Sequence, residues 1–160
     1  MSFFRKGILK KKGRMISLKI KDIMTDNVAV VSPDATVIEV AQLMQKHDVG
    51  AVPVCEGTNM VGLVTDRDIV VRNIAHGRDP QHTPVRDVMT TQVKSINPEM
   101  SLSQAAGVMA AQQIRRLPVM DQERLVGMVS LGDLATKAKY DVELATTLGE
   151  ISLPSEPEKM

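Results

Sequence analysis

Residues 62–68 read Gly-Leu-Val-Thr-Asp-Arg-Asp, and residues 127–133 read Gly-Met-Val-Ser-Leu-Gly-Asp. In both stretches an apolar run ends at a hydroxyl residue, and an aspartate follows three positions later. A hydroxyl and an acid at this spacing are typical of a helix start, because each side chain can accept a hydrogen bond from the other residue's backbone N–H. The stretch therefore predicts a buried strand that leads directly into a helix, and it predicts this twice.

The two stretches belong to a repeat with a constant offset of 65 residues. Working outward, the same offset carries residues 20–25 (Ile-Lys-Asp-Ile-Met-Thr) to residues 85–90 (Val-Arg-Asp-Val-Met-Thr) without a gap. It also carries Pro53-Val54 to Pro118-Val119. Self-similarity at a fixed period indicates two copies of one structural unit.

Each copy predicts the order strand, helix, strand, strand, helix. A β-rich run ends at a proline, which cannot continue a strand. A helix start with a capping-box pattern follows, and then two apolar runs separated by turn residues. In chain order the first copy gives a strand at 28–31, a helix start at Thr36 with Glu39, and strands at 52–55 and 60–64; the second gives a strand at 93–96, a helix start at Ser101 with Gln104, and strands at 117–120 and 125–129.

The predicted fold class is α/β (α+β), with two β-α-β-β-α units packed about a pseudo-two-fold axis. One unit alone has a small sheet whose apolar face its own chain can barely cover, so two units are expected to bury these faces together. We expect a basic arm at 1–19, a first unit at 20–80, a connection at 73–84, a second unit at 85–146 and a flexible tail at 150–160. A further helix at 137–149 would close the core or form a dimer contact.

The composition excludes several classes of protein. The net charge is +1, which predicts neither strong nucleic-acid binding nor attachment to a membrane surface. Aromatic residues make up 2% of the chain, too few for the stacking platforms that bind single-stranded nucleic acids. No stretch approaches the roughly 18 apolar residues of a membrane helix, and no secretory signal is present, so we expect a cytoplasmic protein.

The residues that could carry metal or nucleophilic chemistry favour a structural role. Cys55 is the single cysteine and lies in an apolar run, which indicates a small buried residue. Three histidines share no ligand spacing with it, so no metal site is expected. The methionines at 24, 44, 89 and 109 fall on apolar faces, where core packing is the expected role. No glycine loop of the Walker or Rossmann type appears, and we expect no enzyme.

The repeated hydroxyl–acid pairs allow two interpretations. Free backbone N–H groups at a helix start attract phosphate, and a carboxylate in the same turn can accept hydrogen bonds from a ribose diol. The alternative is that Thr65 with Asp68, and Ser130 with Asp133, are only capping boxes. The two interpretations are compatible, because one acid could cap the empty helix and contact ribose in a complex.

The chain resembles a tandem pair of cystathionine-β-synthase (CBS) domains, also called a Bateman module. The matching elements of the first copy are Asp-Ile-Met-Thr (22–25), Val-Gly-Ala-Val-Pro-Val (49–54) and Gly-Leu-Val-Thr-Asp-Arg-Asp-Ile (62–69). Those of the second are Asp-Val-Met-Thr (87–90), Arg-Arg-Leu-Pro-Val (115–119) and Gly-Met-Val-Ser-Leu-Gly-Asp-Leu (127–134). Each motif is weak singly, but six in order are specific, and they cover about residues 20–140.

The resemblance implies two clefts that bind adenosine-containing nucleotides as regulatory ligands, with AMP or ATP as the first candidates. It also implies a non-catalytic module that forms homodimers and signals to an effector protein. Asp68 and Asp133 would hold ribose hydroxyls, with Thr65 and Ser130 close to ribose or phosphate. The first adenine pocket would be lined by Asn27, Val28, Gly50, Ala51, Val52 and Pro53. The second would be lined by Gln92, Val93, Arg116, Leu117 and Pro118.

The two copies differ at positions that matter for phosphate. The second has Arg115-Arg116 where the first has Gly50-Ala51, and Gly132 replaces Arg67. Guanidinium groups suit phosphate oxygens, so these arginines are candidate phosphate contacts; the alternative is an exposed basic pair before an edge strand. We expect the two clefts to bind with different affinities.

Two further functions stay open. The module could be a structural dimerisation unit with no nucleotide. It could also be a nucleic-acid-associated regulator that uses the basic arm, although glycines at 7 and 13 weaken a continuous helix there and a solvated leader is favoured.

Overall fold

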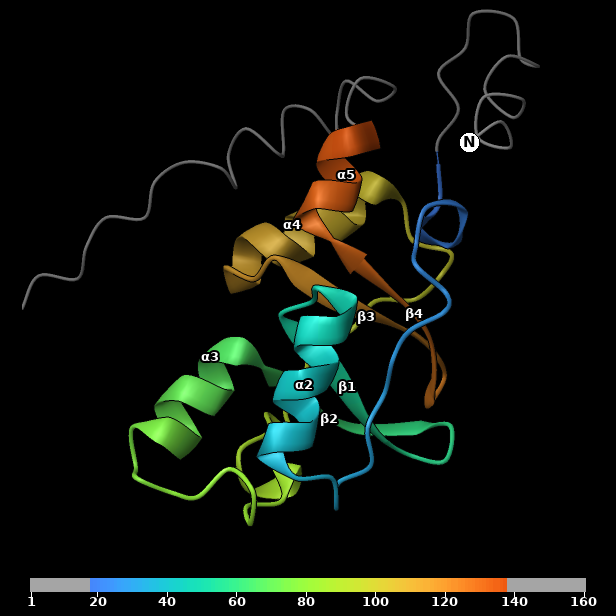
Figure 1. The fold of residues 1–160 in the computed structure, drawn as a ribbon. Helices are drawn as coiled ribbons and strands as arrows, with labels where there is room; N and C mark the ends of the chain where they lie inside the picture. The colour runs from blue at the N-terminus through green and yellow to red at the C-terminus, as the bar shows by residue number, and fades with distance from the viewer. Residues whose placement is uncertain (1–17, 138–160) are drawn as a thin grey trace, which may run out of the picture. The chain divides into compact units, whose positions relative to one another are not determined.

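The computed structural model describes residues 18–137, which form short helices and one four-stranded sheet (Figure 1). The strand order in the sheet is β1-β2-β4-β3. The mixed helix-and-strand class predicted from the sequence is confirmed. In chain order the elements are η1 (Ile20–Asp22), α2 (Val37–His47), β1 (Ala51–Glu56), β2 (Asn59–Thr65), α3 (Asp66–Asp68), η2 (Ile69–Ile74), η3 (Val85–Asp87), α4 (Leu102–Gln112), β3 (Arg116–Asp121), β4 (Arg124–Ser130) and α5 (Leu131–Lys137).

The described chain divides into two compact units. Residues 26–95 and 120–127 form the first-repeat unit, and residues 18–25, 96–119 and 128–137 form the second-repeat unit. In the first-repeat unit β1 pairs antiparallel with β2, and β2 meets β4 antiparallel at Asn59 and Arg124.

The two long helices begin as their capping-box patterns predict. Thr36 accepts a hydrogen bond from the backbone N–H of Glu39, whose carboxylate accepts one from the N–H of Thr36. Ser101 and Gln104 make the same reciprocal pair at α4. Both helices also end alike, in left-handed residues at Asp48 (φ 52°) and Gln113 (φ 53°).

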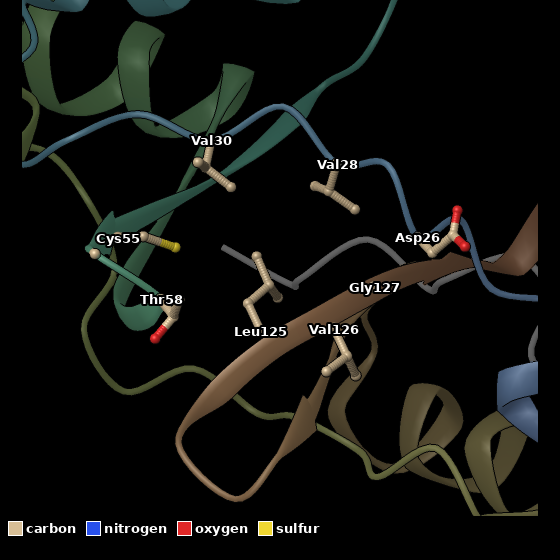
Figure 2. A pocket seen from close by; sticks show the side chains of 9 residues that line it. Asp26, Val28, Val30, Cys55, Thr58, Leu125, Val126 and Gly127 are labelled. Carbon is tan, nitrogen blue, oxygen red and sulfur yellow. The ribbon is translucent and has the colours of Figure 1, made fainter.

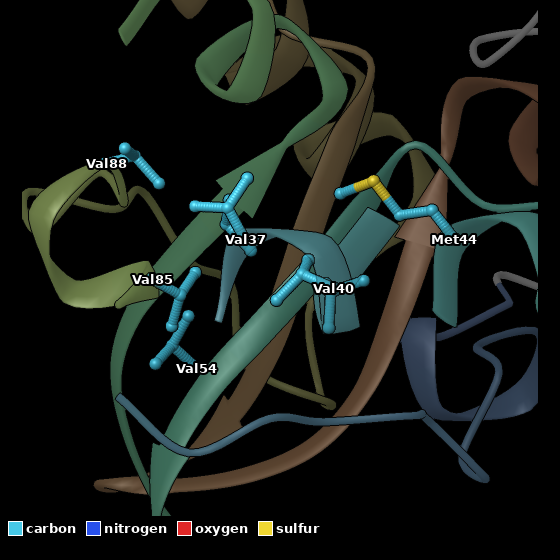
Figure 3. Packing of buried hydrophobic residues seen from close by; sticks show 8 residues of the cluster. Val37, Val40, Met44, Val54, Val85 and Val88 are labelled. Atoms are coloured by element: carbon cyan, nitrogen blue, oxygen red, sulfur yellow. The ribbon is translucent and has the colours of Figure 1, made fainter. Parts of the chain in front are cut away.

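The first-repeat core joins α2 to the β1–β2 hairpin and to η3. Figure 3 shows Val37 and Val40 of α2 near Val54 of β1 and Val85 of η3, while Met44 of the same helix lies farther from them in the same cluster. Burying one aliphatic side chain of this kind stabilises the fold by roughly 1.5–3 kcal/mol relative to leaving it exposed to water. The complete cluster is Val37, Val40, Met44, Val52, Val54, Val64, Val85 and Val88, with Met89 partly buried against it.

The second-repeat unit buries the matching positions. The inner face of α4 carries Leu102, Ala105, Ala106 and Met109, all fully buried. The predicted core role of the methionines is confirmed for Met44 and Met109, while Met24 and Met89 are half-buried. The other buried apolar residues of this unit are Leu18, Ile20, Ile96, Leu117, Val119, Val129 and Leu134.

The first predicted strand of each copy was wrong as a strand. Residues 28–31 and 93–96 contribute only single parallel bridges, Val31 with Val54 and Ile96 with Val119. In the first copy the ladder ends at once because the chain turns after Val31, where the N–H of Asp34 donates to Oγ of Ser32. The proline that follows has no N–H with which to continue it.

The Asp-x-Met-Thr segments are exchanged between the repeats. Residues 20–25 lie in the second-repeat unit, where Ile20 and Lys21 donate to the carbonyls of Met100 and Pro98 and Thr25 bridges Met128. Residues 85–90 lie in the first-repeat unit, where Thr90 bridges Leu63. The compact units therefore cut across the two sequence repeats.

Several predicted segments fall outside the described residues. These are most of the basic arm at 1–19, all but the first residue of the helix at 137–149, and the tail at 150–160. The predicted connection at 73–84 begins two residues later than expected, because Asn73 and Ile74 still belong to η2. Within residues 18–137, no helix is long and apolar enough to span a membrane.

Candidate functional site

Strand β2 delivers Thr65 and Asp68 to the start of α3, as the sequence predicts. The N–H of Asp68 donates to Oγ1 of Thr65 at 3.0 Å, and the N–H of Thr65 donates to Oδ2 of Asp68 at 3.0 Å. Position 66 is fixed as well, because its N–H donates to the carbonyl of Gly50 at 2.9 Å. The capping interpretation is therefore confirmed.

The exchanged segment brings a further hydroxyl to the same acid. Oγ1 of Thr90 donates to Oδ2 of Asp68 at 3.4 Å, and Nε of Arg72 lies 3.8 Å from Oδ1. Arg72 is held in turn, because its guanidinium donates to the carbonyls of Val88 and Met89 at 3.3 and 3.1 Å. Asp68 is thus a buried carboxylate between a helix start, a threonine and an arginine.

Gly62 permits the close approach of the exchanged segment. A Cβ atom at Gly62 would lie 2.6 Å from Sδ of Met89 and 3.0 Å from the carbonyl oxygen of Thr90. The next residue, Leu63, exchanges both backbone hydrogen bonds with Thr90, at 2.9 and 2.8 Å. The glycine of this motif therefore brings Thr90 within reach of Asp68.

The second copy repeats this local geometry at the start of α5. The N–H of Ser130 donates to Oδ2 of Asp133 at 2.8 Å, and the N–H of Asp133 donates to Oγ of Ser130 at 3.1 Å. The N–H of Leu131 donates to the carbonyl of Arg115 at 2.7 Å, the contact that matches position 66 with Gly50. Arg115 and Arg116 are exposed at the start of β3.

The exchange also decides in which unit the predicted pocket segments lie. Asn27 and Val28 lie in the first-repeat unit, as Asp68 does, and their contact with a ligand stays a prediction. Gln92 and Val93, which follow Thr90 closely, lie in the first-repeat unit with Asp68 and not in the second-repeat unit. Because each repeat looked self-contained in sequence, nothing in the pattern indicated that the segments would cross over.

The remaining predicted residues divide by exposure. Ala51, Val52, Pro53, Leu117 and Pro118 are buried in β1 and β3, so only their backbone can face a ligand if the strands keep this packing. Asn27, Arg67, Gln92 and Gly132 are exposed, and Gly50 is half-buried.

A pocket of about 200 Å³ lies elsewhere in the first-repeat unit (Figure 2). Figure 2 shows Val28 and Val30 pointing from their segment toward Cys55 and Leu125. Neither Thr65 nor Asp68 lines it. The complete lining is Asp26, Val28, Val30, Cys55, Gly57, Thr58, Leu125, Val126 and Gly127.

The sequence pointed to only one residue of this pocket, Val28. The alternation of Val28 and Val30 places both side chains on one side of an extended chain and could have indicated Val30 as well. Leu125 and Val126 were expected only as strand residues. The pKa of the Cys55 thiol is raised by burial, so the thiol stays neutral, in agreement with a small buried residue.

No metal-binding constellation occurs in the part of the chain that the structure describes. Within residues 18–137 there is no group of three or more His, Cys, Asp or Glu side chains that could hold an ion.

Comparison with known proteins identifies the repeat. The family model of the CBS domain matches residues 20–73 and again 85–139. The CBS domain-containing protein YhcV of Bacillus subtilis is 51% identical over 133 residues, which are 83% of this chain and 94% of that protein.

Solved structures agree with the fold. Hypoxic Response Protein I, solved with two coordinated zinc ions, is 34% identical, with a TM-score of 0.69 over 74% of this chain and 98% of that one. The CBS domain pair of protein MJ0100, solved with 5′-methylthioadenosine and S-adenosyl-L-methionine, is 23% identical, with a TM-score of 0.69 over 76% of this chain and 95% of that one.

Proposed function

Because this chain belongs to the CBS domain family and carries two copies of the domain, we propose that it is a regulatory module that binds an adenosine-containing nucleotide and signals to an effector protein. AMP and ATP are the first candidate ligands. We place the module in the cytoplasm as a homodimer without catalytic activity of its own.

The main support is the repeated placement of a carboxylate at a helix start. Asp68 has Oδ2 engaged by Thr65 and Thr90, while Oδ1 has only the Arg72 guanidinium near it, at 3.8 Å. A carboxylate oxygen has two lone pairs, so this arrangement leaves acceptor capacity for the hydroxyls of a ribose. Acids bind ribose diols in this way in dinucleotide-binding folds.

The apolar pocket of the first-repeat unit offers a second kind of support. Its walls are aliphatic at Val28, Val30, Leu125 and Val126, and glycine backbone borders it at Gly57 and Gly127. Aliphatic faces with nearby backbone groups suit an uncharged heterocycle, and such pockets with few polar groups are typical of small-molecule sites. The CBS domain pair of MJ0100 was solved in complex with 5′-methylthioadenosine and S-adenosyl-L-methionine, which gives this ligand class a precedent in the family.

Isothermal titration calorimetry on the full chain tests the proposal, with AMP, ATP, S-adenosylmethionine and NADH as ligands. The informative variant is Asp68→Asn, because an amide oxygen can still accept from the N–H of Thr65 and preserve the cap. A neutral side chain with one acceptor should nevertheless weaken ribose binding at least tenfold, about 1.4 kcal/mol. Asp133→Asn tests the second copy in the same way.

Asp121→Asn is the matched control, because Asp121 is exposed at the end of β3 and should leave binding unchanged. If none of the four ligands binds, the result would favour the structural alternative, in which the acids act only as helix caps. Both acids already make complete capping boxes, which is the observation in favour of that alternative. The nucleic-acid alternative depends on the basic arm, outside the described residues.

A further inference from the structure

Arg72 lies beside the carboxylate of Asp68 and is itself fixed by the exchanged segment 85–90. Its Nε atom is 3.8 Å from Oδ1 of Asp68, which lies four residues earlier in the chain. Its Nη1 atom donates to the carbonyl oxygens of Val88 and Met89 at 3.3 and 3.1 Å. One guanidinium is therefore held between the acid and the backbone of the exchanged segment.

The carboxylate of Asp68 has one oxygen held and the other oriented. Oδ2 accepts from the N–H of Thr65 and from Oγ1 of Thr90, at 3.0 and 3.4 Å. The distance from Oδ1 to Nε of Arg72 exceeds that of a hydrogen bond, so the positive charge attracts this oxygen without using its lone pairs. Arg72 thus fixes the direction of Oδ1 and leaves its lone pairs to another donor.

A guanidinium suits this arrangement better than an ammonium group does. Arginine has donors on several edges of one rigid plane, so Nη1 can bind carbonyl oxygens while Nε faces a carboxylate. Lysine has a single nitrogen on a flexible stem. The offset of 65 residues carries Arg72 to Lys137, so the two copies have different cations at this position.

The helix that carries Arg72 is wound in an uncommon way. Residues Ile69–Ile74 form η2, a π-helix, and the N–H of Ala75 after it donates to the carbonyl of Val70 at 2.9 Å. π-helical turns are rare and frequently lie at functional sites. Because η2 begins directly after Asp68, this winding supports a functional role for the turn that joins Asp68 to Arg72.

From these observations we infer that Arg72 is the positioning residue of the first ligand site, because it orients Oδ1 of Asp68 toward the hydroxyls of a ribose. The inference rests on the proposed nucleotide function, since it needs a ribose at Asp68. A hydroxyl that donates to a fixed oxygen loses less binding free energy to the ordering of the acid. Arg72 itself acts through Asp68 and need not contact the ligand.

Ribose discrimination tests the inference on the full chain. Asp133→Asn is present in the parent chain and in every variant, so that the ribose preference belongs to the first copy. Titration calorimetry with adenosine and with 2′,3′-dideoxyadenosine gives the ratio of the two dissociation constants. In the parent, adenosine should bind at least about tenfold more tightly, and Arg72→Met should reduce this ratio about fivefold or more.

Two further variants separate positioning from support of the fold. Arg72→Lys, which keeps the charge, should also reduce the ratio, because one nitrogen cannot hold both carbonyls and face the acid. With Asp68→Asn added, Arg72→Met should cause no further loss of adenosine affinity, since both changes remove the same interaction. Circular dichroism and the melting temperature should show that each variant keeps its fold.

Arg78→Met is the matched control, because the Arg78 guanidinium anchors the same segment through Asp87 at 2.9 Å. Losing an anchor that does not involve Asp68 should leave the ratio unchanged. An unchanged ratio in Arg72→Met, an equal loss of affinity for both nucleosides, or the same fall in the ratio for Arg78→Met would each overturn the inference.

The wild type distinguishes this failure from a failure of the proposed function. If the wild type binds adenosine and the Asp133→Asn parent does not, ribose recognition belongs to the second copy, and only the inference about Arg72 is overturned. If neither chain binds either nucleoside, the proposed function is contradicted and this inference is overturned with it.

Discussion

At the scale of single residues, two glycines of this chain differ in the space available for a side chain. A methyl group at Gly62 would press on Sδ of Met89 at 2.6 Å and on the carbonyl oxygen of Thr90 at 3.0 Å. The methionine can move, but the carbonyl is tied to Leu63 by a backbone bridge. At Gly107, in the interior of α4, a Cβ atom would meet no atom within 4 Å apart from the adjacent residues and the backbone of the same helix.

We therefore predict that Gly62→Ala lowers the free energy of unfolding by about 1–3 kcal/mol, the usual cost of overpacking. Gly107→Ala should raise it by roughly 0.5–1 kcal/mol, because alanine is the better helix former. Urea denaturation of both variants against the wild type checks the pair. Equal signs for the two changes would contradict the close approach of residues 89–90 to β2.

What the sequence could predict at this scale depends on how local each interaction is. The caps at Thr36, Ser101 and Thr65 follow from residues three apart, so their pattern was sufficient. The contact between Thr90 and Asp68 joins residues 22 positions apart. No local pattern encodes it, because it depends on which repeat the exchanged segment joins.

At the scale of elements, the exchanged segments are fixed by ion pairs at matching places. Lys19 and Lys21 pair with Glu99 at 2.6 and 2.8 Å, beside the backbone bonds of η1. In the other unit Arg86 pairs with Asp34, and these two residues are the repeat equivalents of Lys21 and Glu99. Each segment is therefore held both by its backbone and by an exposed ion pair to the loop before a long helix.

The charge on Glu99 predicts an acid-dependent loosening of residues 19–22. Hydrogen bonds from Lys19 and then Lys21 lower the pKa of the Glu99 carboxyl from 4.5 to about 2. Since the folded pKa lies below the unfolded one, the stabilisation is complete above about pH 4.5 and is lost as the pH falls toward 2. The groups are exposed, so salt should weaken the effect.

Hydrogen exchange at the amides of Ile20 and Lys21 measures this effect. Glu99→Gln should raise their exchange rates at neutral pH and remove most of the acid-dependent change seen in the wild type. Glu123→Gln, an exposed acid in the turn between β3 and β4, should alter neither. Protection that stays the same in Glu99→Gln would mean that the backbone bonds to Met100 and Pro98 hold the segment alone.

Element type and position were predictable wherever burial alternates clearly or a cap is present. The β1–β2 hairpin and helix α2 follow from such patterns. The stretch at 28–31 looked like a strand because of its valines, yet only Val31 pairs, and Val30 is 45% exposed. β-propensity reflects packing against neighbours more than backbone preference, and most of this segment has a pocket beside it instead of a partner strand.

At the scale of the whole molecule, the repeat gives two equivalent frameworks with different surfaces. Asp68 and Asp133 cap their helices in the same way, so the hydrogen bonds at the two helix starts give no reason for a difference in ligand affinity. The side chains around them do, because Arg115 and Arg116 of the second copy are exposed where the first copy has Gly50 and buried Ala51. Affinity for the charged part of a ligand should therefore differ between copies, while affinity for the nucleoside part should be closer.

We predict that Arg115→Gly with Arg116→Ala, which gives the second copy the residues of the first, weakens ATP binding about tenfold at one class of site. A hydrogen bond from a guanidinium to a charged group contributes about 1.5–3 kcal/mol when sheltered, and less at an exposed position. Adenosine, which has no phosphate, should bind the variant and the wild type alike. Titration calorimetry with both ligands checks this, and adenosine serves as the control for the fold of the site. An equal loss of ATP and adenosine binding in the variant would show that the arginines stabilise the fold of β3 and do not bind phosphate. Two sites of equal ATP affinity in the wild type would contradict the predicted difference between the copies.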